Sequence, residues 1–446
     1  MSDLTALRSH FYGEVFTEES PGYDAARRPL DPGFQHVFPR VVPRCRSRSD
    51  VVEAVRYARA TGERLAVRGG GHCFAGRSTT NGIVLDLSGL DGISVADDAS
   101  ATVGGGARLD RVYGVLHACR RTLPAGCGAS VGMGGLTLGG GIGLLGRTYG
   151  LTSDQLLGAQ VVLADGSVVN CGHHQAPDLF WSLRGAGGCQ FGVVVSLRFG
   201  TVCEPLTTRI EVNWPNSHPQ ELVAAWQAWA PDAPNEVTMN LTFLADPGRP
   251  LSATLHGAST SNTDSTRDLL ENFLTHLDTT ARPQLRGGVP YHQLKASFPD
   301  LQSPPGHPRL RSELFSAPLT RTTIDALLDL LQEPGARGRR RLTFTAMGVA
   351  YNRLPESATA FAHRSERFIL EHVGETSDPW IDSSWSAAHR DGSGRVYPNF
   401  PDPALEDWAG AYHAGNYPRL VAVKQTYDPD RLFDFPQAIG STERQS

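Results

Sequence analysis

The chain has 446 residues, of which 41 are Lys or Arg and 46 are Asp or Glu, so its formal charge is −5 at neutral pH. A general polyanion binder would carry a basic excess, so this balance excludes that class and, with it, a nucleic-acid partner. Hydrophobic residues at 40% and charged residues at 20% are typical of a globular chain, and the length predicts two or three domains.

The first half of the chain alternates between predicted helices and strands around glycine turns. Residues 50–62 predict an amphipathic helix with an N-cap at Ser49 and a stop at Gly62, because apolar side chains recur with helical spacing. The Asp165-Gly166 pair favours a tight turn in a hairpin over residues 159–170. Apolar and β-branched clusters predict further strands over residues 63–67, 82–88 and 191–199.

After residue 204 glycine becomes rarer and longer amphipathic stretches appear. The pattern predicts helices over residues 219–230, 263–277 and 322–332, and strands over 236–244 and 341–351. This mixture indicates a second α+β domain whose sheet has one face covered by helices. The basic run Arg337–Arg341 is interpreted as a solvated surface segment.

The seven cysteines are an odd number without a CxxC pair, so neither a disulfide framework nor a cysteine-ligated zinc site is predicted. No histidine triad or carboxylate cluster stands out, and we expect no metal ion. The first residues lack the apolar core of a signal peptide, and no apolar run of about 18 residues follows. We therefore expect a cytoplasmic protein with reduced thiols and no membrane partner.

Glycine is concentrated between Gly126 and Gly146, where it supplies ten of 21 residues. Such a backbone can present several N–H groups to an oxyanion at close range, which favours a pyrophosphate site. A packed loop without a ligand is the alternative, and it explains the entropic cost of so many glycines poorly. The sub-string Gly141–Gly146 matches GxGxxG, but no hydrophobic strand directly precedes it, so it is not a dinucleotide fingerprint.

A second glycine turn, RGGGH, spans residues 68–72 and follows a predicted strand. Its arginine would neutralise phosphate, and its three glycines would let a large planar ligand come close to His72. The alternative is a tight turn with a surface histidine, and the motif by itself does not decide between them.

Four sequence segments carry a family resemblance and follow one another in the order found in that family: RGGGHCFAG (68–76), VGMGGLTLGGGIGLLGRTYGLTSD (131–154), PDLFWSLRGAGGCQFGVVVSLRF (177–199) and VYPNFPDP (396–403). Together they resemble the FAD-linked oxidases of the vanillyl-alcohol oxidase superfamily, and more closely its berberine-bridge-enzyme-like group. The resemblance covers essentially the whole chain except residues 205–340. It is more specific than any single motif.

The resemblance implies an α+β fold of two domains. Residues 1–204 and 402–446 would form the FAD-binding domain, and residues 205–401 an inserted substrate-binding domain with an antiparallel sheet covered by helices. It also implies FAD joined covalently through His72 to the flavin C8 methyl carbon. Many relatives carry a second link from a cysteine three residues before the valine of the VG-x-GG segment.

That second position is Gly128 here, and Cys127 lies one residue earlier. A one-residue shift turns the side chain elsewhere, so we expect a single link, with Cys127 as a small, inert, buried filler. A flavin thioether at Cys127 is the alternative.

The resemblance further implies the residues around the ligands. Cofactor-binding residues are expected at Arg68, Gly69, Gly70, Gly71, His72, Gly76, Ser78, Val131, Gly132, Gly134, Gly135, Gly139, Gly140, Gly143, Gly192, Val193, Val194, Tyr397 and Asn399. Substrate-binding residues are expected at Tyr291, His292, Tyr351, Trp380 and Phe400.

The family's C-terminal Tyr-x-Asn-Tyr segment appears here as Tyr397-Pro-Asn-Phe400. In several relatives the second tyrosine removes a hydroxyl proton, which Phe400 cannot do. Tyr397 is our first candidate for that role, although its pKa would have to be lowered by a nearby Lys or Arg. The alternative is that Tyr397 only packs against the flavin or hydrogen-bonds to it. His363 is the second catalytic candidate, with a structural histidine as its alternative.

The activity implied is that of an oxidase. A hydride would pass from a C–H bond beside O or N of a small molecule (a secondary metabolite, a sugar alcohol or an amine) to flavin N5. O2 would then reoxidise the flavin and give H2O2. Loss of the second tyrosine keeps an alternative in view, a flavin-containing cyclase or isomerase without net redox turnover. The sequence indicates neither the substrate nor the oligomeric state.

Overall fold

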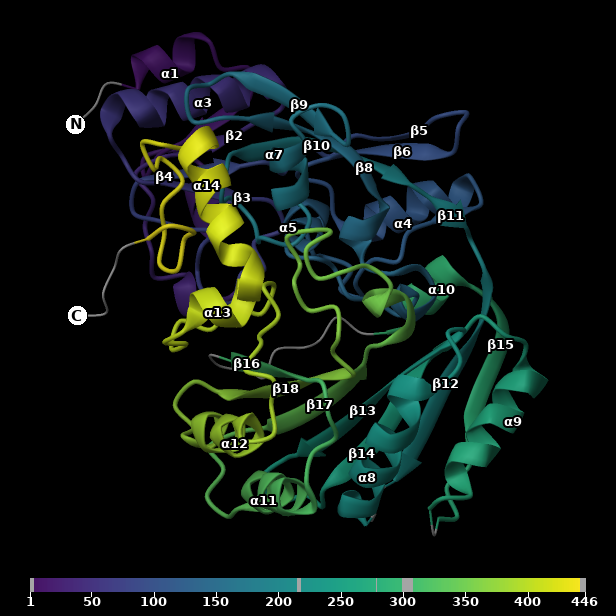
Figure 1. Ribbon diagram of the computed structural model, residues 1–446. Coiled ribbons are helices and arrows are strands. Elements are labelled where there is room, and N and C mark those ends of the chain that lie inside the picture. The colour runs from purple at the N-terminus through teal and green to yellow at the C-terminus, as the bar shows by residue number, and fades with distance from the viewer. Residues whose placement is uncertain (1–3, 215–217, 278, 299–307, 442–446) are drawn as a thin grey trace.

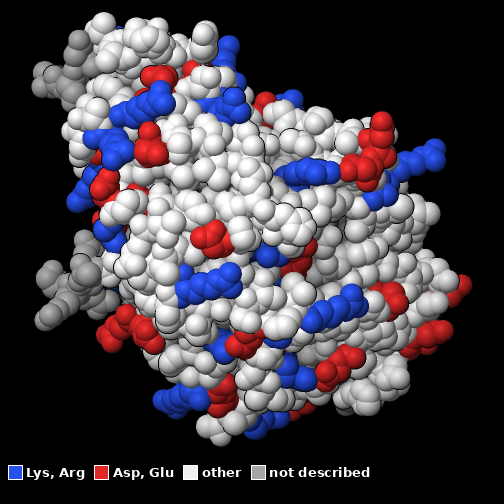
Figure 2. Space-filling model, turned by 45° about the horizontal axis from the view of Figure 1, so that its top comes forward, with Lys and Arg blue, Asp and Glu red and all other residues white. Residues whose placement is uncertain are grey.

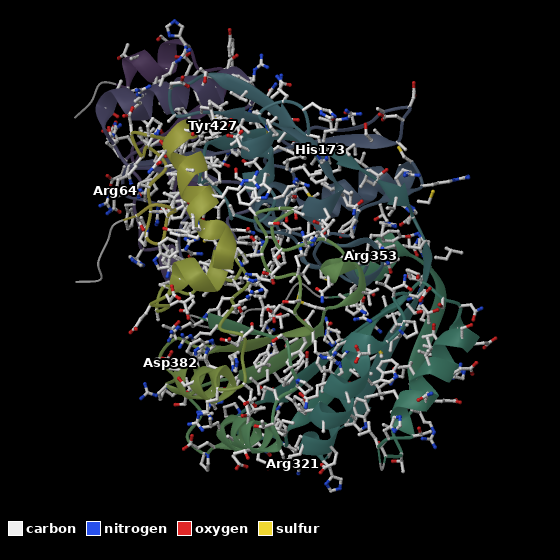
Figure 3. All side chains as sticks on the ribbon, viewed as in Figure 1. Arg64, His173, Arg321, Arg353, Asp382 and Tyr427 are labelled. Carbon is white, nitrogen blue, oxygen red and sulfur yellow. The ribbon has the colours of Figure 1, made fainter. Side chains whose placement is uncertain are left out.

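The computed structural model describes residues 4–214, 218–277, 279–298 and 308–441. Figure 1 shows two halves, with the largest sheet and its helices below and the smaller sheets above. The C-terminal helix α14 (Tyr417–Tyr427) returns to the upper half, where Figure 3 labels its last residue, Tyr427. The Tyr427 hydroxyl donates to Asp178 at 2.8 Å. The chain therefore leaves the upper half, builds the lower one and comes back.

The upper half contains two main sheets. A four-stranded sheet has the order β1-β2-β4-β3, with β4 parallel to both of its neighbours, and a five-stranded antiparallel sheet has the order β5-β6-β10-β8-β9. Their strands are β1 (Glu14–Phe16), β2 (Val42–Arg44), β3 (Leu65–Arg68), β4 (Ile83–Asp86), β5 (Ile93–Val95), β6 (Ser100–Gly104), β8 (Leu156–Val162), β9 (Val168–Gly172) and β10 (Val193–Gly200). A short pair joins β7 (Arg121–Thr122) to β11 (Val202–Cys203).

The predicted local structure of this half is largely confirmed. The hairpin is β8–β9, and Gly166 takes the positive φ of 80° that its tight turn requires. The first long helix, α3 (Arg48–Thr61), ends before Gly62 as expected. Its N-cap, however, is Ser47 and not Ser49, because Ser47 and Asp50 form a reciprocal capping box.

The lower half is a seven-stranded antiparallel sheet in the order β15-β12-β14-β13-β17-β18-β16. Its strands are β12 (Leu206–Trp214), β13 (Val237–Ala245), β14 (Ser252–Ser259), β15 (Gln284–Pro290), β16 (Pro308–Phe315), β17 (Arg340–Ala346) and β18 (Phe368–Glu375). Helices α8 (Pro219–Trp229), α9 (Thr263–Leu274), α11 (Arg321–Gln332) and α12 (Trp380–His389) supply side chains to one apolar core with it. The expectation of an antiparallel sheet with a helix-covered face is confirmed.

Two expectations for this half are wrong. The strand expected over residues 341–351 ends at Ala346, because Gly348 turns the chain at φ 82° and Tyr351 falls in a short 3-10 helix (Val349–Asn352). The run Arg337–Arg341 is not a solvated segment throughout. Its Arg340 starts β17, is 4% exposed and donates to Asp378 at 2.8 Å.

The other helices are α1 (Thr5–Ser9), α2 (Tyr23–Arg27), α4 (Leu109–Ala118), α5 (Met133–Leu138), α6 (Gly146–Tyr149), α7 (Pro177–Ser182), α10 (Tyr291–Ala296) and α13 (Trp408–His413). Across the described residues, none of the helices is long and apolar enough to span a membrane. On the face drawn in Figure 2, acidic and basic side chains are interspersed, as the nearly balanced charge predicts.

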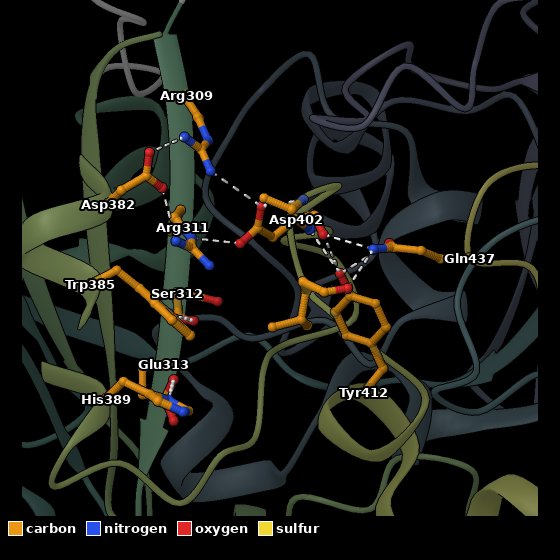
Figure 4. Close-up of polar contacts among 12 residues, drawn as sticks. Arg309, Arg311, Ser312, Glu313, Asp382, Trp385, His389, Asp402, Tyr412 and Gln437 are labelled. Atoms are coloured by element: carbon orange, nitrogen blue, oxygen red, sulfur yellow. Dashed lines mark hydrogen bonds and ion pairs between the residues drawn. The ribbon is translucent and has the colours of Figure 1, made fainter. Parts of the chain in front are cut away.

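A buried ion pair fastens the C-terminal segment to the large sheet (Figure 4). Arg311 of β16 donates to Asp402 at 2.6 Å, and their side chains are only 7% and 3% exposed. Arg311 also bonds to Asp382 of α12 at 2.9 Å. On the other side, the backbone N–H of Asp402 donates to the Tyr412 hydroxyl and its carbonyl accepts from Gln437. The segment that precedes Asp402, residues 396–400, is thereby held against the sheet.

Candidate functional site

Two glycine segments far apart in sequence meet in the upper half. A Cβ atom added to Gly70 would lie 2.3 Å from the backbone nitrogen of Gly132, and one added to Gly132 would lie 2.4 Å from that of Gly70. Gly105 touches the same place, because a Cβ atom on Gly134 would lie 2.7 Å from its carbonyl oxygen. Only glycine permits this approach, so the two glycine segments converge here.

The turn at this junction offers backbone donors to a ligand. Within the described part of the chain, the N–H groups of Gly69, Gly70 and Gly71 donate no hydrogen bond to protein. The buried hydroxyl of Ser78 likewise lacks a partner among the described residues. Gly71 is buried and Gly69 and Gly70 are partly buried, and N–H groups in such places are nearly always satisfied, so this cradle has the chemistry of an oxyanion site.

His72 lies directly after this turn and connects it to the second glycine segment. Its Nε2 lies 3.0 Å from the Ser130 hydroxyl. A hydrogen bond at one ring nitrogen fixes both the tautomer and the orientation of an imidazole. The two segments that the sequence singled out therefore share a polar contact as well as a steric one.

Arg68 was expected to neutralise phosphate, but its guanidinium is occupied by contacts within the protein. Its guanidinium donates to the carbonyls of Ala26 and Arg27 and lies 3.6 Å from Asp86. Burial lowers the pKa of Arg68, and the Asp86 carboxylate opposes that shift. The side chain thus ties the turn to the α2 segment and to β4.

Tyr397 and Asn399 lie against the second glycine segment. The N–H groups of Gly141 and Ile142 donate to the Tyr397 hydroxyl oxygen at 2.9 and 3.2 Å, and Asn399 Nδ2 donates to it at 2.9 Å. Asn399 also donates to the Leu136 carbonyl, and a Cβ atom on Gly139 would collide with its amide. Residues 397–399 and 139–142 therefore form one unit.

Burial raises the pKa of Tyr397, and the three N–H donors lower it by less. A tyrosine base needs the opposite net shift. In the part of the chain that the structure describes, no Lys or Arg contributes to lowering it. The positive field that the sequence required of this residue is therefore not there, and the geometry favours its packing role.

Tyr351 clamps the same glycine segment from the sheet side. Its hydroxyl donates to the Gly143 carbonyl at 2.9 Å and accepts from the Gly143 N–H at 3.1 Å. A Cβ atom on Gly146 would lie 1.7 Å from that hydroxyl. Tyr351 joins Tyr397, Phe361 and Ile369 in one apolar cluster, with Phe400 packed on its edge.

His363 and Phe400 lie around this cluster. His363 is fully buried, its ring nitrogens have no partner among the described residues, and burial lowers its pKa to about 3. It packs edge-on to Phe361 at 5.1 Å. Phe400 packs edge-on to Tyr397 at 5.0 Å and to Phe74 at 5.9 Å.

Other expected residues fall in different places. Tyr291 packs edge-on to Tyr113 at 5.8 Å, and His292 stacks on His117 at 3.9 Å, at the crossing between the halves. Trp380 is not brought to the cluster, because it belongs to α12 and is buried in the helix-covered core. Gly76 packs on the Phe34 ring and Gly140 on Phe361, whereas Gly135 has open space. Gly192 precedes β10, which begins with Val193 and Val194 beside Gly105, and the Val131 carbonyl accepts from the Leu109 N–H.

Cys127 is exposed. The interpretation of this residue as a buried filler is therefore wrong. The thiol lies within electrostatic range of Tyr351 and Tyr113. The Tyr113 hydroxyl donates to the neighbouring Gly126 carbonyl at 3.0 Å, which places Cys127 at the edge of the glycine segment.

Glu371 is a site residue that the sequence analysis missed. It lies on β18, two residues after Ile369, and on the face of the sheet opposite to Leu370, which belongs to the helix-covered core. It is 7% exposed, and its Oε2 has no partner among the described residues. Burial raises the pKa of Glu371, the Arg341 guanidinium lowers it by less, and the carboxylate in turn raises the pKa of Tyr397.

The neighbours of Glu371 on this inner face are polar. The residues paired with it across the strands are Thr343 of β17 and Ser312 of β16, and paired residues share a face. Asn240 and Thr345 form the adjoining pair. Asn240 Oδ1, Ser312 Oγ and Arg341 Nε are buried without partners among the residues described. The sheet therefore presents unsatisfied polar atoms towards the Tyr397 cluster.

A family model described as FAD binding domain matches residues 39–172, and one described as Berberine and berberine like matches residues 396–440. The chain is 30% identical over 461 residues to YgaK, an uncharacterized FAD-linked oxidoreductase of Bacillus subtilis (strain 168), with 97% of this chain and 98% of that one covered. This similarity spans both halves of the fold.

Two solved structures share the fold. The BBE-like 1 protein of Physcomitrella patens has a TM-score of 0.88 at 24% identity, covering 99% of this chain and 100% of that one. Glucooligosaccharide oxidase from Acremonium strictum, which carries a 6-S-cysteinyl, 8α-N1-histidyl FAD, has a TM-score of 0.88 at 24% identity, covering 98% and 99%. The α+β fold implied by the sequence is confirmed, and this chain belongs to the berberine-bridge-enzyme-like family of FAD-linked oxidoreductases.

Proposed function

We propose that the protein is an oxidase for a small molecule carrying a C–H bond beside oxygen or nitrogen, with O2 as acceptor and H2O2 as product. Among the substrate classes considered, a secondary metabolite, a sugar alcohol or an amine, the inner face favours one with hydroxyl groups. The observation that carries the proposal is Glu371, a buried carboxylate facing the Tyr397 cluster. The flavin, when bound, supplies the hydride acceptor at N5 and the route for electrons to O2.

The residues at the junction fit FAD. The N–H groups of Gly69, Gly70 and Gly71 would hold the pyrophosphate, and Ser78 offers a hydroxyl to the same ligand. The Tyr397–Asn399 segment would lie along the isoalloxazine. In this assignment residues 1–204 and 402–446 form the FAD-binding domain, and residues 205–401 form the substrate-binding domain, which also contributes Tyr397 and Asn399 to the cofactor site.

The covalent link is assigned to His72 alone. The hydrogen bond between His72 Nε2 and Ser130 fixes the ring and directs the link to its other nitrogen. The N1-histidyl link in the glucooligosaccharide oxidase supports this assignment. Cys127 is exposed near the glycine segment, so the thioether alternative has to be tested directly.

Glu371 takes the role of proton acceptor that Phe400 cannot fill. A carboxyl group whose pKa is raised by burial is a suitable base near neutral pH. It would accept the hydroxyl proton of the substrate as the hydride leaves the neighbouring carbon. Tyr397, with three N–H groups directed at its oxygen, orients residues 139–142.

Anaerobic mixing with a substrate tests the oxidase assignment. A panel of sugars, sugar alcohols, amines and hydroxylated aromatic compounds is first scored by peroxide release. Bleaching of the flavin without O2 is expected for each hit, followed by recovery of the yellow colour and stoichiometric H2O2 when O2 is admitted. Product formed without bleaching would instead establish the cyclase or isomerase alternative.

Acid denaturation tests the link. Flavin absorbance should stay with the precipitated wild-type chain and with a Cys127→Ala variant, and it should be lost from a His72→Ala variant. A covalent flavin that survives in His72→Ala would assign the link to Cys127. In Ser130→Ala the covalent fraction should be smaller at equal total FAD.

A further inference from the structure

Three residues with metal-binding side chains meet where the chain crosses between the halves. His117 lies near the end of α4, Glu204 follows β11, and His292 is the second residue of α10. One possible ligand atom from each lies within 4.8 Å of the other two. Glu204 is 87 residues from His117 and 88 from His292, so no sequence motif announces the cluster.

Both oxygens of Glu204 face the histidines. Its Oε2 lies 2.6 Å from His117 Nδ1, and its Oε1 accepts the backbone N–H of His292 at 2.8 Å. The Glu204 side chain is 7% exposed, whereas that of His117 is 36% exposed. The carboxylate is therefore fixed, and the cluster opens to solvent on the His117 side.

His292 provides an independent observation. Its Nδ1 is buried and has no hydrogen-bond partner in the described part of the chain. A buried, unsatisfied imidazole nitrogen close to a carboxylate and a second imidazole is placed as a metal ligand requires.

We propose that His117, Glu204 and His292 bind one divalent transition-metal ion, for which zinc is the best match, with water completing the coordination. Two histidines and one glutamate are a known zinc ligand set. On binding, the ion takes the place of the hydrogen between His117 Nδ1 and Glu204 Oε2, and the neutral His117 ring carries its hydrogen on Nε2 instead.

The rings have to move for this to happen. They are stacked at 3.9 Å with an interplanar angle of 23°, and an imidazole nitrogen binds a metal in the plane of its ring. One ring must therefore tilt out of the stack. His117, being partly exposed, can do so without displacing core atoms.

The ion would join three elements from both halves. Tyr291, next to His292, packs on Tyr113 of α4, whose hydroxyl donates to the Gly126 carbonyl at 3.0 Å. The site therefore fastens α10 to α4 beside the glycine segment. A ligand that binds only the native state raises its stability, so zinc should raise the thermal unfolding midpoint.

The test uses the full-length flavoprotein, prepared without a histidine tag and freed of metal with a chelator. Titration with zinc chloride in a calorimeter is expected to show one ion per chain, with a rise in the unfolding midpoint. His117→Ala, at the partly exposed position, should weaken binding more than about tenfold and abolish the rise. Glu204→Gln should do the same. Cobalt should give visible d–d bands beyond the flavin absorption, and these should disappear in both variants.

His174→Ala is the matched control, because it removes a histidine from the exposed His173–His174 pair after β9 (Figure 3). It should bind zinc as the wild type does. A wild-type chain that takes up no zinc, or a His117→Ala variant that binds zinc unchanged, would overturn the proposal. Loss of binding in His174→Ala with retention in His117→Ala would assign the ion to the surface pair and overturn it as well.

Discussion

The glycine junction, where Gly70 meets Gly132, and the inner face of the large sheet, which carries Glu371, both border the candidate site, but they depend on different physical effects. At the junction the absence of side chains brings two backbones together, as at Gly70 and Gly132. On the inner face the decisive features are side chains without partners, above all Glu371. A substitution that places an atom between two touching backbones disrupts the local structure, whereas one that removes a charge alters the electrostatics and leaves the structure in place. Substitutions in the two regions should therefore differ in kind.

The junction should tolerate no added atom, which makes Gly70→Ala the largest expected effect. The new Cβ would lie 2.3 Å from a backbone nitrogen that cannot move without displacing α5. We expect loss of bound flavin, measured as the ratio of flavin to protein absorbance. Gly114→Ala, with open space around its Cβ and a helical backbone, should keep full flavin content and gain about 0.5–1 kcal/mol of stability. Equal flavin content in the two variants would refute the steric account.

A substitution on the inner face should lower the reaction rate without changing the structure. Glu371→Gln should slow anaerobic flavin reduction about 10³-fold, because it removes a proton acceptor while preserving shape. Flavin content and unfolding midpoint should hardly change.

The pH profile sharpens this prediction. A base works in its ionised form, so the wild-type rate should rise with pH through a pKa above the ordinary range of Glu, since burial raises the pKa of Glu371. The variant should lack that step. If Glu371→Gln reduced flavin at the wild-type rate, the proton acceptor would be Tyr397, or the reaction would need no protein base.

The same contrast explains what the sequence can predict. Glycine at residues 70 and 132 has one physical reason to recur, so composition marks both segments, and their order along the chain carries the family resemblance. Glu371 lies in FILEHVGE, a strand buried on both faces, where alternation does not separate the inner from the outer side. Trp380 was expected in the site for the complementary reason, because an aromatic residue gives no sign of which face it covers. His117, Glu204 and His292 come together only through tertiary structure.

Asp402→Asn tests the connection between the two regions. Its carboxylate pairs with Arg311 at 2.6 Å, with both side chains nearly buried (Figure 4). The substitution removes the buried partner of Arg311, which keeps only the half-exposed Asp382, at a cost of about 2 kcal/mol. We expect a lower unfolding midpoint and weaker retention of residues 396–400 at the flavin, seen as faster proteolysis near the C-terminus. Arg321→Gln, which removes an exposed ion pair with Glu221, should change the midpoint by less than about 1 kcal/mol.

The smallest expected effect is that of substituting Glu313 of β16, and this substitution also serves as a control for Glu371→Gln. The two carboxylates lie on adjacent strands and opposite faces, because Glu313 pairs with Leu370 and Glu371 with Ser312. Unlike Glu371, Glu313 has partners on both oxygens: the Gly394 N–H at 2.9 Å and His389 Nδ1 at 2.9 Å. Burial nevertheless raises the pKa of Glu313 from 4.5 to about 7.

That shift fixes the sign of a pH effect on stability. Between these two pKa values the unfolded chain ionises while the folded chain keeps its proton, so the wild-type unfolding free energy falls as pH rises through this window. Glu313→Gln mimics the protonated form and should lose most of this fall, a difference of roughly 2 kcal/mol between about pH 5 and pH 8. The readout is the change in unfolding midpoint between those two conditions. Because Glu313 faces α12, on the opposite side of the sheet from Glu371, the Glu313→Gln variant should reduce flavin at the wild-type rate. A slowed rate would show that the sheet does not separate its two buried carboxylates.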